Sequence, residues 1–278
     1  MDIAIIGLGL TGGSLARTAK LRTDCRIFGF DRDRETVRLA IALGAIDAEL
    51  NDEKLRGCQI VLICLYPGEI VSWLKENAGR IAPDTLVIDC GGVKRAVMDG
   101  ASEIARGQRW HFIGGHPMAG REYSGFRYAR DDLFDNSSMI LTPMPKEELP
   151  VLQRARDFFM DLGFRRVQFT TPPIHDELIA YTSQLLHVIS GAYVMDPLAL
   201  RHKGFSSDAF GGMVHMVGLN EDIWTELMML NRDCLLPEVD GLIERLSAFR
   251  EALSDGDGER LHSLLKQAHE RRESMEDA

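Results

Sequence analysis

Short apolar runs alternate with amphipathic segments from the start of the chain to about Phe169. The apolar runs predict strands, and the segments with apolar residues at helical spacing predict helices. A continuous apolar run such as residues 59–65 is typical of a parallel strand covered on both faces. Regular alternation of strand and helix predicts a doubly wound parallel α/β sheet. The predicted strands are 3–6, 27–30, 59–65, 85–88, 110–113, 139–142 and 167–170, and the main predicted helices are 34–43, 69–78, 94–105 and 146–162.

The alternation stops near Thr171, and only helical periodicity follows, at residues 176–195, 223–253 and 258–273. Pro237 is expected to kink or split the second of these helices, because proline lacks the amide hydrogen that an interior turn needs. The glycine-dotted stretch 203–220 is expected to be a loop.

These patterns predict two domains, residues 1–171 with the sheet and residues 172–278 with helices only. A length of 278 residues suits two domains. Because a long helix with two apolar faces has to bury both, the all-α domain is expected to form a homodimer.

The first predicted strand runs directly into a GxGxxG turn at residues 7–12, and the second ends at Asp31. The three glycines allow a tight turn, close approach of a pyrophosphate, and packing of the next helix, whose N-terminal amides bind phosphate. A carboxylate at Asp31 accepts hydrogen bonds from the adenosine ribose and repels a 2′-phosphate, which favours NAD over NADP. Arg32 and Arg34 weaken that preference, so NADP is the less favoured alternative. The turn therefore predicts a Rossmann NAD-binding domain, and an ordinary glycine-rich turn is the alternative. The expected cofactor-contacting residues here are Gly7, Leu8, Gly9, Leu10, Thr11, Gly12, Asp31 and Arg32.

Composition narrows the classes of partner. The net charge is −10 and no basic run is present, so nucleic acid is not expected as a partner. No apolar stretch approaches the roughly 20 residues of a membrane span, and the chain starts directly in a predicted strand, so neither membrane insertion nor a signal peptide is expected. The 5 cysteines lack CxxC spacing and the 8 histidines lack HxxxH spacing. We therefore expect reduced thiols, a cytoplasmic location and no metal site.

Ligands of an open parallel sheet bind beyond the carboxyl ends of its strands. His116 follows two glycines and precedes Pro117, which predicts a stiff loop at such an end. A histidine there can exchange a proton beside a nicotinamide, and the alternative is a loop histidine bonded to a carbonyl group. Asp89 is expected to bond the ribose or to cap the next helix. Lys94 is expected to meet the cofactor or to be solvated at the start of that helix.

Residues 114–120 read GGHPMAG, followed by Glu122 and by Ser124-Gly125. This segment resembles the GGHPMAG-x-E-x-SG motif of the prephenate and arogenate dehydrogenases of tyrosine biosynthesis. The DCGGVK sequence at 89–94, His175-Asp176, and residues 210–224 resemble further segments of that family.

The resemblance implies NAD-dependent oxidative decarboxylation of a cyclohexadienyl acid, prephenate or arogenate, by a homodimer. It implies that His116 accepts the proton of the ring 4-hydroxyl or hydrogen-bonds to it, with Glu122 as a second catalytic residue.

Three positions that contact the substrate in the family are different here. The family's serine falls on Gly92, a histidine falls on Gln184, and the arginine that holds a substrate carboxylate falls on His215. The last change weighs most, because a bidentate guanidinium–carboxylate pair is stronger than any contact that histidine offers.

Arg121 and His187 are the expected replacements for these groups in binding a dicarboxylate substrate, and Arg121 is expected to supply the missing cation. The basic cluster at 201–203 is either part of the site or a solvated loop. Two alternatives to the prephenate or arogenate reaction remain: a dehydrogenase of a related acid such as 4-amino-4-deoxyprephenate, and a non-catalytic nucleotide-binding paralogue.

Overall fold

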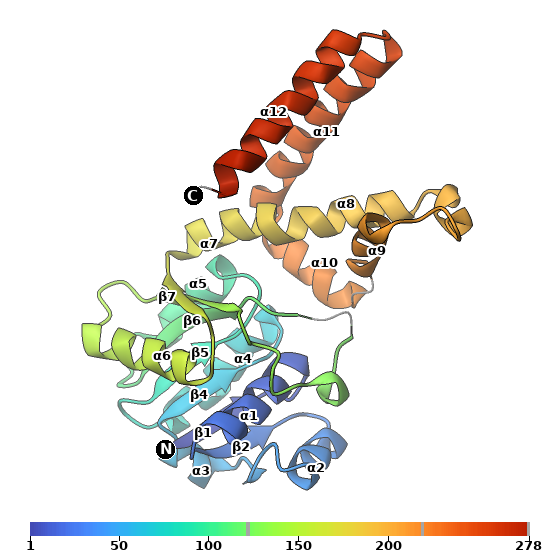
Figure 1. The fold of residues 1–278 in the computed structure, drawn as a ribbon. Coiled ribbons are helices and arrows are strands. Elements are labelled where there is room, and N and C mark those ends of the chain that lie inside the picture. Colours follow the sequence, from blue (N-terminus) through green and yellow to red (C-terminus); the bar gives the residue numbers. More distant parts are fainter. Residues whose placement is uncertain (121–122, 218–219, 277–278) are drawn as a thin grey trace. The chain divides into compact units, whose positions relative to one another are not determined.

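The computed structural model describes residues 1–120, 123–217 and 220–276 (Figure 1). The chain forms two compact units, Met1–Asn231 and Arg232–Ala278. The first contains an eight-stranded sheet with its helices, and the second is a pair of helices.

The sheet of the first unit has the strand order β3-β2-β1-β4-β5-β6-β7-β8. All neighbouring strands pair in parallel except β6 and β7, which pair antiparallel. The chain runs from β1 to β2 and β3 on one side and then crosses back to β4 on the other side of β1, so a crevice opens beyond the carboxyl ends of β1 and β4. The strands are β1 (Asp2–Ile6), β2 (Arg26–Phe30), β3 (Ala48–Glu49), β4 (Ile60–Ile63), β5 (Leu86–Asp89), β6 (His111–Pro117), β7 (Ser138–Pro143) and β8 (Arg166–Phe169).

Alternate side chains of the central strands enter two separate cores. Ile3 and Ile5 belong to one buried cluster, whereas Ala4 and Ile6 belong to the other. Helices α1, α2 and α6 complete the first cluster, and α3, α4 and α5 complete the second, so both faces of the sheet are covered. These helices are α1 (Leu10–Arg22), α2 (Arg34–Ala42), α3 (Asp52–Gly57), α4 (Pro67–Asn77), α5 (Arg95–Ala105) and α6 (Leu149–Asp161).

The doubly wound α/β class is confirmed, but three details differ from the prediction. The sheet is not wholly parallel, because the described part of the β6–β7 connection holds only a short 3₁₀ turn (Phe126–Tyr128) and no crossover helix. The short elements β3 and α3 had no clear sequence pattern. Asn51 begins α3, since its side chain accepts a hydrogen bond from the amide of Lys54 at 2.9 Å.

Helices follow the last strand in the first unit. Helix α7 continues through a π-helical turn into α8, so the two share one path (Figure 1). The prediction of a loop at 203–220 was wrong, because α9 lies within it. The Phe210 ring of α9 packs against the rings of Tyr193 and His202 at 6.1 and 5.0 Å, a contact that no local pattern displays. The elements are α7 (Pro172–Ile179), the π-turn (Ala180–Gln184), α8 (Leu185–Val194), a 3₁₀ turn (Pro197–Arg201), α9 (Asp208–His215) and α10 (Glu221–Leu230).

The predicted split of a long helix at Pro237 was also wrong in position. The helix ends at Asn231 instead, and Pro237 lies inside α11 (Arg232–Ser254). Asn231 is fully buried and donates from Nδ2 to the carbonyl oxygen of Asp176 at 2.8 Å and to Oε1 of Gln184 at 2.9 Å. Its backbone, with φ −115° and ψ 18°, is outside helical geometry.

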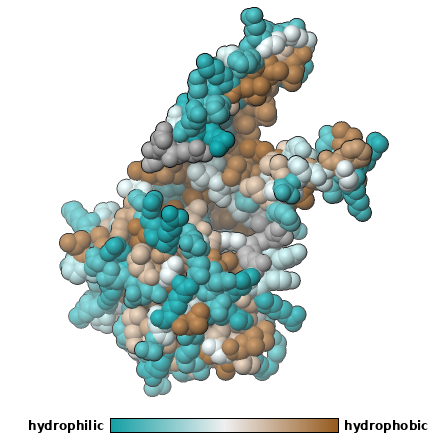
Figure 2. All heavy atoms as spheres, in the orientation of Figure 1, coloured by the Kyte–Doolittle hydropathy of each residue, from teal (hydrophilic) through white to brown (hydrophobic). Residues whose placement is uncertain are grey.

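The second unit consists of α11 and α12 (Gly258–Glu276), which pack against each other. Large apolar side chains remain exposed on α11, among them Leu236, Ile243, Leu246 and Leu253. Figure 2 shows apolar side chains gathered along the α11 side of this pair. Among the described residues no helix is long and apolar enough to cross a membrane.

Candidate active site

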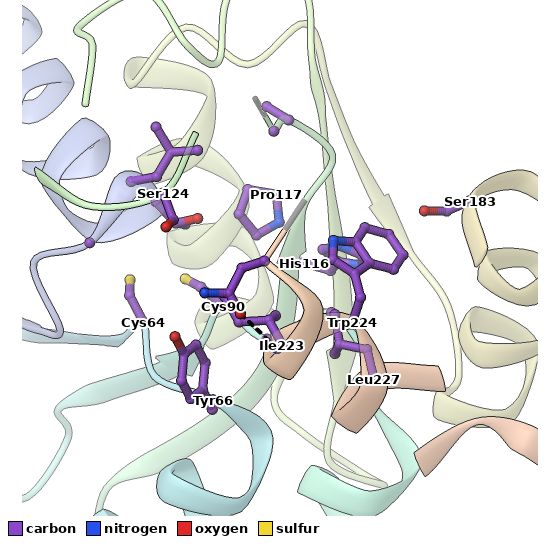
Figure 3. A pocket seen from close by; sticks show the side chains of 18 of the residues that line it. Cys64, Tyr66, Cys90, His116, Pro117, Ser124, Ser183, Ile223, Trp224 and Leu227 are labelled. Carbon is purple, nitrogen blue, oxygen red and sulfur yellow. Dashed lines mark hydrogen bonds between the residues drawn. The ribbon is translucent and has the colours of Figure 1, made fainter. Parts of the chain in front are cut away.

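A cavity of about 930 Å³ lies beyond the carboxyl ends of β1, β4, β5 and β6 in the first unit (Figure 3). One wall comes from the sheet and its turns, including Gly9, Tyr66 and His116. The opposite wall comes from the π-turn, α8 and α10, and includes Gln184 and Trp224. The cavity is therefore shared between the sheet and the helices that follow it.

The glycine turn after β1 fits a pyrophosphate. Gly7 has a φ of +87°, and a Cβ built there would lie 2.4 Å from the carbonyl oxygen of Cys64. A Cβ at Gly12 would lie 1.9 Å from the carbonyl oxygen of Gly7, whereas a Cβ at Gly9 would meet nothing within 4 Å. The turn is thus closed against the protein and open on the side of the cavity, where Leu10 and Thr11 begin α1.

Asp31 is fixed to the same turn. Its Oδ2 accepts a hydrogen bond from the amide of Leu8 at 2.8 Å, and its Oδ1 accepts one from the amide of Asp33 at 2.9 Å. The side chain of Arg32 is exposed and pairs with Glu69 at 3.3 Å. The hydrogen bond from Leu8 therefore holds the carboxylate against the turn.

Asp89 and Lys94 form a fully buried ion pair below the cavity floor. Lys94 Nζ also donates to the carbonyl oxygen of Gly115 at 2.6 Å. Asp89 Oδ1 accepts from the amide of Gly91 at 2.9 Å, and Asp89 does not cap α5. The solvated alternative for Lys94 was wrong, since the pair joins the ends of β5 and β6 inside the protein.

His116 lies in strand β6, opposite Ile140 of β7, so the predicted loop position was wrong. Antiparallel pairing with β7 extends β6 to Pro117, and this pairing depends on residues far along the chain. The His116 ring lines the cavity (Figure 3). Its Nδ1 lies 2.9 Å from Nε2 of His175. The second ring nitrogen of His116, Nε2, lies on the side of the imidazole away from this contact.

His175 lies in the first turn of α7 and joins His116 to a carboxylate. Its Nδ1 lies 2.7 Å from Oδ1 of Asp176, and both residues are buried. Oδ1 of Asp176 accepts from the amide of Lys94 at 2.7 Å, and Oδ2 accepts from the amide of Arg95 at 2.9 Å and from its Nε at 3.1 Å. Asp176, His175 and His116 thus form a row of hydrogen-bonded side chains. The row leads from the start of α5 to the cavity.

The surroundings favour neutral imidazoles. Burial, the neighbouring His175 and Lys94 hold the pKa of His116 well below its usual value. Burial is also the main cause that lowers the pKa of His175. Hydrogen bonds from His175 and from the amides of Arg95 and Lys94 lower the pKa of Asp176 despite its burial. Near neutral pH the arrangement is one carboxylate and two uncharged rings.

On the opposite wall, Gln184 is buried and bonded within the protein. Its Nε2 donates to the carbonyl oxygen of Leu227 at 3.2 Å, and its Oε1 accepts from Asn231. His187 directs Nδ1 to the carbonyl oxygen of Met216 at 2.9 Å, and its ring lies 3.8 Å from that of Trp224. Burial lowers the pKa of His187. This wall is polar in places but uncharged near neutral pH.

Gly92 and His215 also line the cavity. A Cβ at Gly92 would lie 3.1 and 3.3 Å from the two terminal carbons of Leu227, so a larger residue would press on this leucine. The glycine and Leu227 therefore fit one another across the cavity.

Two family models match the chain in succession. Prephenate dehydrogenase, nucleotide-binding domain, matches residues 15–168, and prephenate dehydrogenase, dimerization domain, matches residues 171–267. The chain belongs to the prephenate dehydrogenase family.

Relatives of known structure or function in this family span almost the whole chain. Prephenate dehydrogenase of Bacillus subtilis is 27% identical over 285 residues, which cover 98% of this chain and 76% of the relative. Cyclohexadienyl dehydrogenase of Zymomonas mobilis is 26% identical and covers 97% of this chain, with 94% of its own length. A crystal structure of prephenate dehydrogenase from A. aeolicus with hydroxyphenyl propionate and NAD+ superposes with a TM-score of 0.86 at 25% identity, covering 99% of this chain and 98% of that one. Arogenate dehydrogenase of Synechocystis superposes with a TM-score of 0.82 at 27% identity, covering 99% and 100%.

The described lining of the cavity is poor in positive charge. No lysine or arginine is among the described residues that line it. Arg121 and Glu122 lie outside the described residues, and Arg201 and Lys203 are exposed and do not line the cavity. Among residues 1–120, 123–217 and 220–276 there is also no group of three His, Cys, Asp or Glu side chains that could hold a metal ion.

Three features of the site escaped the sequence analysis. The His175–His116 bond could have been suspected from a His-Asp pair at the start of a helix, but its partner lies 59 positions earlier. Trp224 and Leu227 lie one helical turn apart on α10; Trp224 ends the family-like segment 210–224, but neither side chain was predicted to line the site. Cys64 and Cys90 follow adjacent strands, and their thiol hydrogen bond, with burial, raises the pKa of Cys64 well above its usual value.

Proposed function

We propose that this chain is an NAD-dependent dehydrogenase that oxidatively decarboxylates a cyclohexadienyl acid, prephenate or arogenate, in tyrosine biosynthesis. The observation that carries the proposal is the position of His116, a ring held in a cavity that also opens onto the glycine turn. The two family models and the relatives across the whole chain support the same reaction.

The cofactor assignment depends on the glycine turn. Because a side chain at Gly7 or Gly12 would collide with backbone while Gly9 stays open, the turn suits a pyrophosphate at the start of α1. Asp31, whose carboxylate is bonded to the amide of Leu8 in the turn, would hydrogen-bond a ribose, which favours NAD over NADP. When bound, NAD supplies the carbon that accepts a hydride from the substrate ring.

His116 would act on the 4-hydroxyl group of that ring. Its Nδ1 is occupied by His175, so Nε2 is the nitrogen that accepts the hydroxyl proton as the carbonyl forms. As the ring carboxylate leaves as CO₂, the electron pair of the broken C–C bond moves through the ring to the carbonyl oxygen, which takes the proton back from Nε2. The ring becomes aromatic, which drives the reaction. The protein therefore has to supply one base and correct positioning. Glu122 is assigned a supporting catalytic role on the strength of the family motif alone.

The test is NADH formation with prephenate, arogenate and 4-amino-4-deoxyprephenate, each measured in parallel with NAD and with NADP. Turnover of prephenate or arogenate supports the proposal. Turnover of the amino compound alone would favour the related dehydrogenase, as the loss of the serine at Gly92 and of the arginine at His215 suggests. Binding of NAD without turnover of any of the three would indicate a non-catalytic paralogue.

We further propose that Arg121 binds a carboxylate of a dicarboxylate substrate, and that His187 and His215 take part in binding this substrate. The described lining has no lysine or arginine, and binding an anion away from water is costly unless a cation pairs with it. Gly92 and Gln184 would contact the substrate ring without contributing a charge.

Arg121→Ala is expected to raise the KM for the substrate by about 10- to 200-fold, because a charge-assisted hydrogen bond contributes about 1.5–3 kcal/mol. The affinity for NAD should change little. Steady-state kinetics and NAD titration measure both quantities, and an unchanged KM would remove Arg121 from the site.

We also propose that the chain is a homodimer that works in the cytoplasm, with the helical region 172–278 as the dimerisation domain. The exposed apolar side chains of α11 and the match to a dimerization domain support the homodimer. The free cysteines agree with a reducing compartment.

A further inference from the structure

We propose that His175 and Asp176 are positioning residues that fix the tautomer of His116, leaving its Nε2 without a proton and facing the substrate cavity. The inference rests on the proposed function of His116 as the base. It deepens that function by naming the two buried residues that keep the base in its active form.

The donor and acceptor order follows from the carboxylate. An ionised Asp176 can only accept hydrogen bonds, so the proton in its 2.7 Å contact with His175 must reside on Nδ1 of His175. A neutral His175 then has a bare Nε2, which accepts the proton in the 2.9 Å contact with His116. His116 therefore carries its proton on Nδ1, and Nε2 keeps a free lone pair.

Asp176 is held so that this order cannot easily reverse. Its two oxygens accept three further hydrogen bonds, from the amides of Lys94 and Arg95 and from Nε of Arg95. Every one of these partners is a donor, so the site is built for a carboxylate and not for an amide. The charged and titratable groups around the two rings are Asp176 on the same helix, Lys94 and Arg95 on α5, and Asp89 at the end of β5.

Gly92 lies in the loop between β5 and α5, on the same wall of the cavity as His116. Gly92 has no hydroxyl group to bond His116, and the space that a side chain would need is bounded by Leu227. Among the described residues His175 is the hydrogen-bond partner of the His116 ring, so the bond through Nδ1 is the one that sets the tautomer.

Asp176→Asn tests the order directly. The new NH₂ group would face two donors if it replaced Oδ2 but only one, the amide of Lys94, if it replaced Oδ1. The amide therefore turns its NH₂ toward His175, and both rings flip to the opposite tautomer. We expect kcat to fall by about 10²- to 10⁴-fold, by analogy with the triad in which an Asp-to-Asn change yields the wrong tautomer. The KM should change less than about threefold.

His175→Gln and His175→Ala form a graded pair. Glutamine can accept from His116 through its oxygen and donate to Asp176 through its NH₂, so it keeps the donor order, whereas alanine removes it. We expect His175→Gln to retain at least about ten times more activity than His175→Ala. His111→Ala is the matched control. His111 lies in β6, the strand that also holds His116, and it bonds Glu147 outside the cavity.

The decisive readout is the ¹⁵N NMR spectrum of histidine-labelled protein with NAD bound, in which protonated and bare ring nitrogens have different shifts. His116→Gln assigns the signal of His116. A bare Nε2 in the wild type and a protonated Nε2 in Asp176→Asn support the proposal. A protonated Nε2 in the wild type overturns it, whatever the activity. Absence of turnover with all three substrates would count against the proposed function instead, because the spectrum does not depend on turnover.

Discussion

The Asp89–Lys94 pair shows how single buried side chains hold the cavity floor. Lys94 bonds the end of β5 through Asp89 and the end of β6 through the carbonyl oxygen of Gly115. His116 follows Gly115 directly, so the pair also sets the position of the proposed base. Breaking a buried pair costs more than forming it gains, because the remaining charge stays without a partner.

Asp89→Asn should therefore lower the free energy of unfolding by about 3–5 kcal/mol. Urea denaturation measures the change. The matched control is Glu35→Gln, which breaks the exposed Glu35–Arg38 pair and should cost less than about 1 kcal/mol. Equal losses in the two variants would show that the buried pair has no special role.

The two site histidines also make stability depend on pH. Because the folded protein holds the pKa of His116 and of His175 below the usual value, the unfolded chain binds more protons. Their contribution is fully present above about pH 6.5 and is lost as the pH falls below that value. The lowered pKa of Asp176 acts in the same direction, but only below about pH 4.

The free energy of unfolding is thus expected to fall between pH 7 and pH 5. In a His116→Gln/His175→Gln double variant this slope should be smaller, and urea denaturation at a series of pH values measures it. Parallel slopes for wild type and variant would contradict the assignment.

At the scale of elements, the turn between β1 and α1 contains one glycine that the fold requires and another that faces the binding cavity. Gly12 faces backbone and Gly9 faces the cavity, so the same substitution should have different effects at the two positions. The element was predictable from sequence because its requirements are local.

Gly9→Ala should leave the thermal midpoint within about 2 °C of wild type and weaken NAD binding by about tenfold or more. Gly12→Ala should lower the midpoint by at least about 5 °C, because its methyl group would overlap a carbonyl oxygen. Calorimetry and NAD titration separate the two effects. Loss of stability in both variants would mean that the turn has no open side.

Most elements of the fold were predictable, and the exceptions have a common cause. Continuous apolar runs located seven of the eight strands, and β3 was missed because it has only two residues. Strand pairing could not be predicted, so β6 was made too short and His116 was placed on a loop. Helix α9 and the end of α10 at Asn231 depend on contacts with distant residues. Within the site, the family motif located His116, but its bond to His175 exists only in the folded chain. The proposed domain boundary near Thr171 stays a prediction.

At the scale of the whole molecule, the exposed apolar side chains of α11 call for a partner. Leu236 and Ile243 are seven residues apart, as are Leu246 and Leu253, so the two members of each pair lie on the same side of the helix. Ile243 and Leu246 are three residues apart, so the two pairs adjoin and form one apolar face. We expect this face to be buried in the proposed homodimer.

An Ile243→Glu/Leu246→Glu variant should shift the protein from dimer to monomer at micromolar concentration, because charges would enter an apolar interface. Analytical ultracentrifugation measures the mass. Gln267→Glu, at an exposed polar position of α12, adds charge without removing apolar surface and should stay dimeric. A dimeric double variant would place the interface elsewhere.

The π-turn between α7 and α8 has a consequence for how this cavity can vary. Each residue advances a helix by about 100°, and a π-turn holds more residues per turn than an α-helix. The extra residue acts as a phase shift along one continuous rod: His175 and Asp176 point to the sheet at one end, while Gln184 and His187 point to the cavity at the other. Deleting one residue from 180–184 would restore a regular helix and rotate the second group out of step with the first. The length of segment 180–184 therefore determines, as much as the identity of its side chains does, which residues of the helix reach the site.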